Sequence, residues 1–341
     1  MVNCTYGPHV YSEQGGMTSR TETHPALLGI ASVLPERVLT NADLERMVET
    51  SDQWITERTG IKVRHLAGEK ETASLLGARA CEKVLDLCGA PDVDLIVTTT
   101  CSGDTLVPPT ACLIQRHLGM KGFPAFDVNA ACSGFVYGMA TAASYIRSGL
   151  AKHVLLVSTE VMSSLIDYED RSTCILFGDG AAAILLGASE ENAVPSIILG
   201  ANGQDAHHIV YEEKPTGKSP AVRMNGRETY RTAVDKMCAM IDGVAEEAGW
   251  GREGIDLIVP HQANYRIMEA VAQRMGLPLD RMVSVIDHMG NTSSASIPLA
   301  LDEAARLGKL HDGDRLACVA FGAGATWGGV GLQWSGSCRH S

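Results

Sequence analysis

The sequence lacks the excess of positive charge that is typical of nucleic-acid-binding proteins. Its 341 residues include 28 Lys and Arg against 40 Asp and Glu, which gives a formal net charge of -12 and a pI near 5.4. Such a surface repels phosphate backbones, so we expect no nucleic-acid partner. An acidic protein could bind only to a local basic patch.

Long apolar runs and paired cysteine motifs are also missing. No stretch approaches the ~18 uncharged residues that a membrane span needs, and the N-terminus has no charged-then-apolar signal pattern. The 10 cysteines include no Cys-x-x-Cys pair, which disfavours both a disulfide framework and a zinc site. We therefore expect a cytoplasmic protein with reduced thiols and no membrane contact.

Neither a metal nor a tightly bound redox cofactor is expected. His207 and His208 are adjacent, but no carboxylate or cysteine stands at ligand spacing from them. The glycine-rich stretch 177–187 falls between two predicted strands, whereas a phosphate-binding loop joins a strand to a helix.

The residues that are present indicate an α/β protein of one large or two fused domains, with 45% hydrophobic and 20% charged residues. Predicted strands alternate with predicted helices, so helices should cover a sheet. Residues 1–24 and 335–341 are polar and show no period, and we expect them to be an extension and a tail without a functional role. The strands are predicted at 26–34, 94–100, 125–128 and 153–158, and the helices at 72–88, 110–118 and 133–148.

The stretch DVNAACSGF (127–135) predicts a nucleophile. A buried strand runs into a tight turn that holds Cys132, and a helix of small residues follows. The positive end of that helix and the free backbone N–H groups of the turn both favour a thiolate. The alternative is a small buried hydrophobic residue, which describes most free cysteines.

The second half of the chain repeats the order of the first. DLIV occurs at 94–97 and at 256–259, and each copy is followed by a strand that ends in aspartate, Asp127 or Asp287. A small-residue turn, a helix, a strand, a glycine-rich turn and a strand then follow in both halves, which indicates a duplicated domain. We place the halves at 25–190 and 226–334, joined by a connection at 191–225.

A pseudo-twofold relation between the halves would bring equivalent turns together. The turn that matches Cys132 holds Asn291, and the strand end that matches 98–100 holds His261. A thiol, an imidazole and an amide donor would then meet at one place. Backbone N–H groups near Cys132 and at 322–324 could hold an oxyanion. Structural roles for the histidine and the asparagine are the alternatives.

The chain resembles β-ketoacyl-acyl carrier protein synthase III, a condensing enzyme of the thiolase-fold superfamily, from about residue 26 to residue 334. The resemblance implies a duplicated five-layer αβαβα architecture with pseudo-twofold symmetry and a Cys-His-Asn triad at Cys132, His261 and Asn291. The motifs that carry it are SDQWITERTGI (51–61), NAACSGF (129–135), FGDGAAA (177–183), PHQAN (260–264), GNTSSASIP (290–298) and FGAGATWG (321–328).

The implied reaction is the decarboxylating condensation of an acyl-CoA primer, acetyl-CoA by default, with malonyl-acyl carrier protein. An acyl group on Cys132 would be the intermediate, and the product, 3-ketoacyl-acyl carrier protein, would initiate type II fatty acid synthesis. The family works as a homodimer, in which the loop at 102–109 reaches the partner's pocket. No cofactor is implied, since acyl-CoA and the acidic carrier protein are substrates.

The resemblance also assigns residues to three binding surfaces. Trp54 and Arg58 share a helical face, although packing of the Trp under the Arg stem is the alternative. Asn264 is assigned to the pantetheine arm, and its alternative or additional role is a helix N-cap. Scattered surface arginines are the alternative to a docking patch. The assignments are Thr50, Trp54, Arg58, Arg171, Gly226 and Asn264 for CoA and pantetheine, Leu176, Phe177, Phe321 and Ala325 for the acyl pocket, and Arg227, Arg231, Arg266 and Arg274 for the carrier protein.

Two departures from common relatives leave the primer length open. Ala325 stands where many relatives have a bulkier residue, and its small side chain could widen the acyl or pantetheine path. The stretch MNGR (224–227) also differs. A condensing enzyme or acyltransferase of a secondary-metabolite pathway that uses a longer acyl-CoA therefore remains an alternative, and a catalytically silent acyl-CoA-binding protein is a second one.

Overall fold

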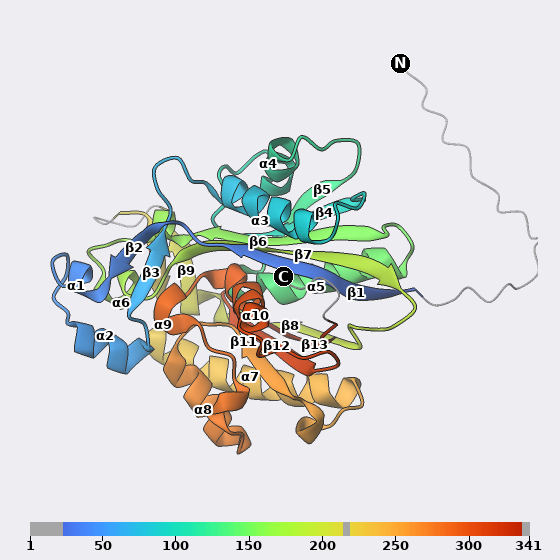
Figure 1. The fold of residues 1–341 in the computed structure, drawn as a ribbon. Helices are drawn as coiled ribbons and strands as arrows, with labels where there is room; N and C mark the ends of the chain where they lie inside the picture. The colour runs from blue at the N-terminus through green and yellow to red at the C-terminus, as the bar shows by residue number, and fades with distance from the viewer. Residues whose placement is uncertain (1–22, 214–218, 336–341) are drawn as a thin grey trace, which may run out of the picture.

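The computed structural model describes residues 23–213 and 219–335. Two β-sheets lie face to face with helices between them and outside them (Figure 1). The predicted terminal extension and tail lie almost wholly outside the described residues. The exceptions are Thr23, His24 and Ser335. His24 starts the first strand and pairs with Ser189, and the Ser335 hydroxyl donates to the Leu27 carbonyl oxygen at 3.2 Å.

The first sheet has five strands in the order β1-β7-β6-β4-β5. Its middle strands are buried along nearly their whole length, as expected for a sheet covered on both faces. The pairs β4–β5 and β4–β6 are parallel, and β1–β7 and β6–β7 are antiparallel. The bounds are β1 His24–Val33, β4 Leu95–Thr99, β5 Ala125–Val128, β6 His153–Val161 and β7 Asp179–Ser189.

The second sheet has the order β11-β12-β13-β8, which repeats β4-β6-β7-β1 of the first. Its β11–β12 pair is parallel, and its other pairs are antiparallel. The counterpart of β5 is reduced to one bridge between Ile258 and Met282, and Asp287 lies in the short helix α9 (Ile286–Met289). The predicted strand ending at Asp287 is therefore wrong. The bounds are β8 Ser196–Ala201, β11 Leu257–Pro260, β12 Arg315–Gly322 and β13 Thr326–Gln333.

The long helices complete five layers, so the predicted αβαβα architecture is confirmed. The helices α3 (Ala73–Leu87) and α4 (Thr110–His117) cover the outer face of the first sheet, and α7 (Gly226–Glu247) and α8 (Tyr265–Met275) lie outside the second (Figure 1). The inner layer is formed by α5 (Gly134–Arg147) and α10 (Ser296–Arg306).

Small residues let the inner helix α5 approach the first sheet closely. A Cβ atom at Gly138 would lie 2.6 Å from side-chain atoms of both Leu156 and Thr99. The central core therefore combines residues of both sheets and both inner helices, such as Leu156, Phe135, Leu299 and Val330. The small-residue pattern predicted this deep packing.

Short elements collect beside the carboxyl ends of β4, β5 and β11, where the site forms. Those labelled at the left of Figure 1 are β2 (Arg37–Thr40), α1 (Asn41–Leu44), α2 (Asp52–Thr59), β3 (Val63–Leu66), α6 (Arg171–Cys174) and β9 (Ile209–Glu212). The strand β10 (Ala221–Met224) pairs with β9.

Short 3₁₀ turns are distributed along the chain: η1 (Ala131–Ser133), η2 (Met162–Leu165), η3 (Gly203–His208), η4 (Arg252–Gly254), η5 (Leu279–Arg281) and η6 (Ser293–Ala295). Among the described residues, no helix is long and apolar enough to cross a membrane.

Candidate active site

Cys132 lies in the turn η1 between β5 and the inner helix α5, as predicted. The residue before it, Ala131, has φ 47°, a left-handed conformation that L residues other than glycine rarely adopt. The strand β12 passes so close that a Cβ atom at Gly322 would lie 2.9 Å from the Cys132 nitrogen and 3.0 Å from its Cβ atom. The backbone around the thiol is therefore tightly confined, and a glycine is required at position 322.

The protonation state of Cys132 differs from the sequence-based prediction. Burial raises the pKa of the thiol to about 11, and the charge of Glu160 also raises it, although a hydrogen bond with Ser293 and the backbone N–H of Cys132 lower it. The position at a helix start therefore does not make this group a thiolate in the free protein. Its proton must pass to a neighbouring group when the sulfur reacts.

His261 follows β11 and is 2% exposed. Burial lowers the pKa of its imidazole to about 4, so the ring is neutral at pH 7. Its Nδ1 lies 2.7 Å from the Ser296 hydroxyl, which also accepts a 3.3 Å hydrogen bond from the Gln262 N–H. The Ser296 hydroxyl can accept a hydrogen bond from Nδ1–H or donate one to a bare Nδ1, so it supports either tautomer of the ring.

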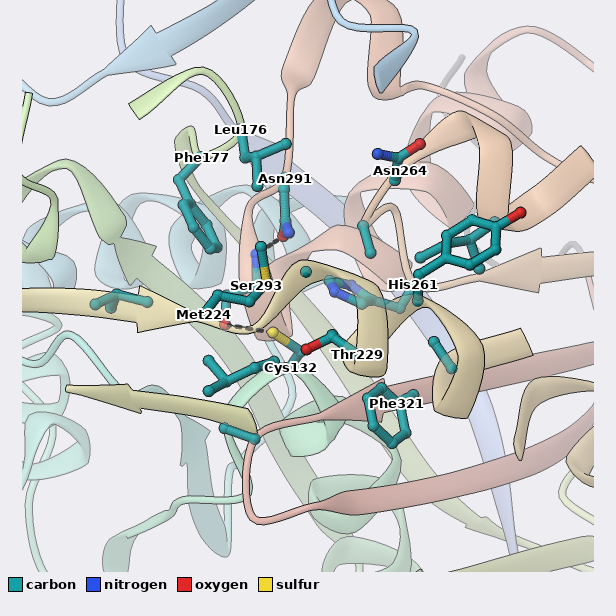
Figure 2. Close-up of a pocket in the computed structure, with 18 of the residues that line it drawn as sticks. Cys132, Leu176, Phe177, Met224, Thr229, His261, Asn264, Asn291, Ser293 and Phe321 are labelled. Atoms are coloured by element: carbon teal, nitrogen blue, oxygen red, sulfur yellow. Dashed lines mark hydrogen bonds between the residues drawn. The ribbon is translucent and has the colours of Figure 1, made fainter. Parts of the chain in front are cut away.

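Asn291 and Ser293 belong to the turn η6 of the second half and the segment before it. The Asn291 Oδ1 atom accepts a 2.9 Å hydrogen bond from the Ser293 N–H, which leaves the Nδ2 amine for a ligand. The Ser293 hydroxyl lies 3.6 Å from the Cys132 sulfur and 3.7 Å from the Cys101 sulfur. Figure 2 shows Cys132, His261, Asn291 and Ser293 around one part of the pocket.

Glu160, on β6, connects the segment that follows β4 to the turn η6 through hydrogen bonds. It is fully buried, and it accepts hydrogen bonds from the Ser102 hydroxyl at 2.5 Å, from the Cys101 N–H at 3.1 Å and from the Ser294 hydroxyl at 2.6 Å. Burial raises the pKa of this carboxyl group, while its hydrogen bonds to Ser102 and Ser294 lower it. Glu160 thus ties the end of β4 to the turn that carries Ser293. No sequence motif had pointed to it.

A cavity of about 600 Å³ contains all three predicted triad residues in its lining. Most of the lining is apolar, and Leu176, Phe177 and Phe321 belong to it as predicted (Figure 2). Apolar residues that the sequence reading had not assigned to the site also line it: Met162, Leu165, Ile175, Ile209, Val210, Val222, Ala233 and Met237. They are core-like residues of scattered segments, which carry no local signal of a pocket.

Ala325 is not among the residues that line the cavity. It is 1% exposed, and its backbone exchanges hydrogen bonds with Asn202 at 2.9 and 3.1 Å. It packs in the same core cluster as Phe177 and Phe321, which do line the cavity, and its effect on the width of the acyl path stays a prediction.

Four of the six residues assigned to CoA line the cavity, and we call the part of the cavity that they border its mouth. Trp54, Arg58, Gly226 and Asn264 line it, and Thr50 and Arg171 do not. The guanidinium groups of Arg58 and Arg171 lie 5.2 and 5.0 Å from the Trp54 ring centre. The Asn264 side chain caps α8 by accepting a hydrogen bond from the Arg266 N–H at 2.9 Å, so the predicted N-cap is present.

Four predicted docking arginines are exposed on α7 and α8 beside this mouth. Arg266 lines the cavity, and Arg231 and Arg274 border a groove between the two helices. Arg274 pairs with Asp235, so part of its charge is compensated. Arg227 stands in the first turn of α7.

A further correction concerns the adjacent histidines. The fold brings Glu228, from the first turn of α7, to 3.2 Å from His208 Nε2 and 4.0 Å from His207 Nε2. The sequence reading had assumed that no carboxylate accompanied them. The three side chains form a group whose ligand atoms lie within 4.8 Å of one another.

Comparison with known proteins gives consistent results. The 3-oxoacyl-[acyl-carrier-protein] synthase III family matches residues 126–203, and its C-terminal counterpart matches 245–334. The β-ketoacyl-[acyl-carrier-protein] synthase III of Coxiella burnetii is 42% identical over 91% of this chain and 99% of its own. That of Rhizobium meliloti is 45% identical over 90% and 98%.

Solved structures agree with the sequence relatives. The synthase III of Pseudomonas aeruginosa superimposes with a TM-score of 0.87 at 41% identity, covering 91% of this chain and 98% of its own. The priming β-ketosynthase of the R1128 polyketide pathway gives 0.88 at 33% identity, covering 94% and 98%.

Fold and site therefore define an acyltransferase of the condensing-enzyme class, with the thiolase-like fold. More closely, the chain belongs to the β-ketoacyl-acyl carrier protein synthase III family, whose condensation initiates type II fatty acid synthesis.

Proposed function

We propose that this protein condenses an acyl-CoA primer with malonyl-acyl carrier protein through an acyl group on Cys132. The observation that carries this proposal is the cavity in which a turn of the first half presents Cys132 and matching elements of the second half present His261 and Asn291. The primer is acetyl-CoA by default.

In the loading step, the Cys132 sulfur attacks the thioester carbon. Because the thiol is protonated in the free protein, His261 Nε2 accepts its proton while Nδ1–H donates to Ser296. The buried imidazole is neutral at pH 7, so its bare nitrogen is free to accept the proton, although its lowered pKa makes it a weaker base than an exposed histidine. The CoA thiolate leaves with the proton returned from His261, and an acyl-enzyme remains.

In the condensation step, His261 and Asn291 hold the thioester oxygen of malonyl-carrier protein. Before this step the neutral imidazole loses its Nδ1 proton and gains one on Nε2 by exchange with water. The Ser296 hydroxyl then donates to the bare Nδ1, and Nε2–H donates to the substrate beside the Asn291 side-chain amide. Both donors stabilise the enolate that forms as CO2 leaves. The enolate carbon attacks the acyl carbon, the bond between that carbon and the Cys132 sulfur breaks, and the expelled thiolate takes up a proton from water to restore the thiol.

The CoA molecule enters the cavity through the mouth, with its adenine end at Trp54. An adenine ring stacks on that indole, and Arg58 and Arg171 supply charge for the phosphates. Thr50 lies near the adenine and phosphate site, and Gly226 and Asn264 border the pantetheine arm. Leu176, Phe177 and Phe321 bound the acyl group.

The acidic carrier protein docks on the arginines of α7 and α8. Arg227, Arg231 and Arg266 supply the attraction that this acidic chain otherwise lacks, and Arg274 contributes less because of Asp235. Reversal of charge at Arg266 should raise the KM for carrier protein and spare loading from acyl-CoA. Equal loss of both would contradict the docking role.

A homodimer completes the proposed assembly in the cytoplasm. The loop at 102–109 exposes Leu106 and Val107, which are 98% and 77% accessible in the single chain. Neighbouring apolar residues with such exposure are typical of contact surfaces. Replacement of both by serine should shift the protein to a monomer in light scattering, and an unchanged dimer would refute this contact.

The decisive experiment is the mass of the loaded protein. Incubation with acetyl-CoA should add one acetyl group on Cys132, and addition of malonyl-carrier protein should then release 3-ketoacyl-carrier protein. An unmodified Cys132, or an adduct that malonyl-carrier protein never discharges, would refute the proposal and favour a silent acyl-CoA-binding protein.

A second candidate is a priming enzyme of a secondary-metabolite pathway that takes a longer acyl-CoA. The apolar lining of the cavity and the likeness to the R1128 priming ketosynthase favour it. Comparison of acetyl-CoA with octanoyl-CoA in the same assay separates the two by the rate of adduct formation.

A further inference from the structure

His207, His208 and Glu228 form a compact group at the rim of the cavity. The two histidines end the turn η3, and Glu228 lies in the first turn of α7. Both neighbours of this group along the chain, Ile209 and Thr229, line the cavity. The group therefore joins two walls of the mouth.

One separation in the group matches that of two ligands on one metal ion, and another is longer, with all the ligand atoms within 4.8 Å of one another. Zinc bonds to nitrogen and oxygen are about 2.0–2.2 Å long, so two ligand atoms on a tetrahedral ion are about 3.3 Å apart. Glu228 Oε2 lies 3.2 Å from His208 Nε2 and 4.0 Å from His207 Nε2. Small side-chain rotations would bring His207 into range, since it is exposed.

The hydrogen bond of His207 determines which of its ring nitrogens can serve as a ligand, whereas the buried Nδ1 atom of His208 has no hydrogen-bond partner in the described part of the chain. His207 Nδ1 lies 3.1 Å from the Gln204 carbonyl oxygen, which can only accept, so Nδ1 carries the proton and neutral His207 has a bare Nε2. The lone pair of His207 Nε2 faces Glu228 Oε2 at 4.0 Å. Both atoms are electron-pair donors, so a cation between them could be bound by both. The Asn225 amide donates to Glu228 Oε2 at 2.9 Å, as outer partners of metal ligands commonly do.

We propose that these three side chains bind a divalent transition-metal ion of the zinc class. Two imidazoles and one carboxylate are a donor set that zinc accepts, with a fourth position left for water. The bound ion would hold η3 against α7 and so stiffen the mouth of the cavity. This site is separate from Cys132 and does not depend on the proposed reaction.

The test is zinc stoichiometry after equilibrium dialysis of the full chain, comparing wild type with His207→Ala and Glu228→Gln. Each variant should lose one equivalent of zinc, and its affinity at this site should fall by more than the roughly 10–100-fold typical for loss of an outer partner. Thiols that bind zinc are common to all the variants, so the difference reports this site alone.

His311→Ala is the matched control, because His311 also pairs with a carboxylate at the surface, 3.5 Å from Asp314. It should keep the equivalent of zinc. Zinc should also raise the melting temperature of wild type and of His311→Ala by binding the folded state, and should do so less in Glu228→Gln.

The competing occupant is a proton shared between His208 and Glu228. Equal zinc stoichiometry in wild type, His207→Ala and Glu228→Gln would overturn the proposal and leave a simple ion pair.

Discussion

The turn η1 before α5 and the turn η6 before α10 share one backbone conformation, but they present different side chains to the cavity. In the first half, Asn129 Oδ1 accepts a hydrogen bond from the Ala131 N–H at 3.1 Å, and in the second, Asn291 Oδ1 accepts one from the Ser293 N–H at 2.9 Å. Ala131 and Ser293 have φ of 47° and 50°. Duplication has therefore preserved the scaffold of the turn.

The difference lies in what each turn exposes. Cys132 faces the cavity, whereas Ser294, at the same place in the second turn, is buried against Glu160. Asn129 points to solvent, whereas Asn291 is 5% exposed and lines the cavity. The first turn supplies the Cys132 sulfur. The second supplies the Asn291 side-chain amide and, in Ser294, a hydroxyl that attaches the turn to Glu160.

The largest effect should follow substitution of the residue that makes the first turn distinct. Cys132→Ser should abolish the acyl adduct and lower kcat/KM by on the order of 10³-fold or more, because a buried hydroxyl is a far weaker nucleophile. Mass spectrometry after acyl-CoA treatment measures the adduct. A full acyl load on the Cys132→Ser protein would mean that another residue carries the acyl group.

The paired asparagines separate chemistry from turn geometry. Asn291→Ala should slow condensation by about 10²–10³-fold and leave loading of Cys132 largely intact, since it removes a donor to the enolate. Asn129→Ala removes the equivalent turn hydrogen bond and should change kcat less than tenfold. Single-turnover rates of loading and condensation distinguish them. If both variants lost condensation equally, the role of Asn291 would be structural.

His261 makes the stability of the protein sensitive to acid. Its pKa falls from 6.5 to about 4 on folding, so between these values the unfolded chain binds more protons. The free energy of unfolding should therefore decrease as pH falls through this window, by up to about 3 kcal/mol from this group. Urea unfolding of wild type and His261→Asn at about pH 7 and about pH 4.5 checks this, and the variant should lose less. Equal losses would assign the sensitivity to other groups.

Substitution of Ser294, which attaches the second turn to Glu160, should have the smallest effect of the four changes and should act on stability. Ser294→Ala removes a 2.6 Å hydrogen bond to buried Glu160 and should lower the free energy of unfolding by about 1–3 kcal/mol. Ser144→Ala, which removes an exposed hydroxyl bonded to Ala140, is the control and should change it by less than about 0.5 kcal/mol. Urea midpoints provide the comparison, and equal stability of the two variants would show that Glu160 does not need Ser294.

The sequence predicted the elements whose signals are local. The β-branched run at 95–99 and the small-residue helix after Cys132 both formed, and the repeat order correctly anticipated two matching sheets. The three proposed triad residues lie in the lining of one cavity because the repeat placed them on matching elements. The family resemblance added the assignment of the mouth and the docking surface.

Features that depend on contacts distant in sequence were not predictable. The raised pKa of Cys132 comes from burial and from Glu160 on another strand, neither of which a motif reveals. Asp287 was assigned to a strand because it resembled Asp127, but the second sheet has no full counterpart of β5. Glu228 reaches His208 only because α7 begins beside η3.

The left-handed residues Ala131 and Ser293 have a consequence for engineering. Glycine would occupy either position without steric penalty, but it would also widen the range of backbone angles open to the unfolded chain and to the turn itself. A residue with a side chain at either position therefore adds backbone strain to the folded turn, but it restricts the backbone angles that the turn and the unfolded chain can adopt. Redesign of this enzyme for new acyl groups should keep Ala131 and Ser293 and vary the other residues that line the cavity.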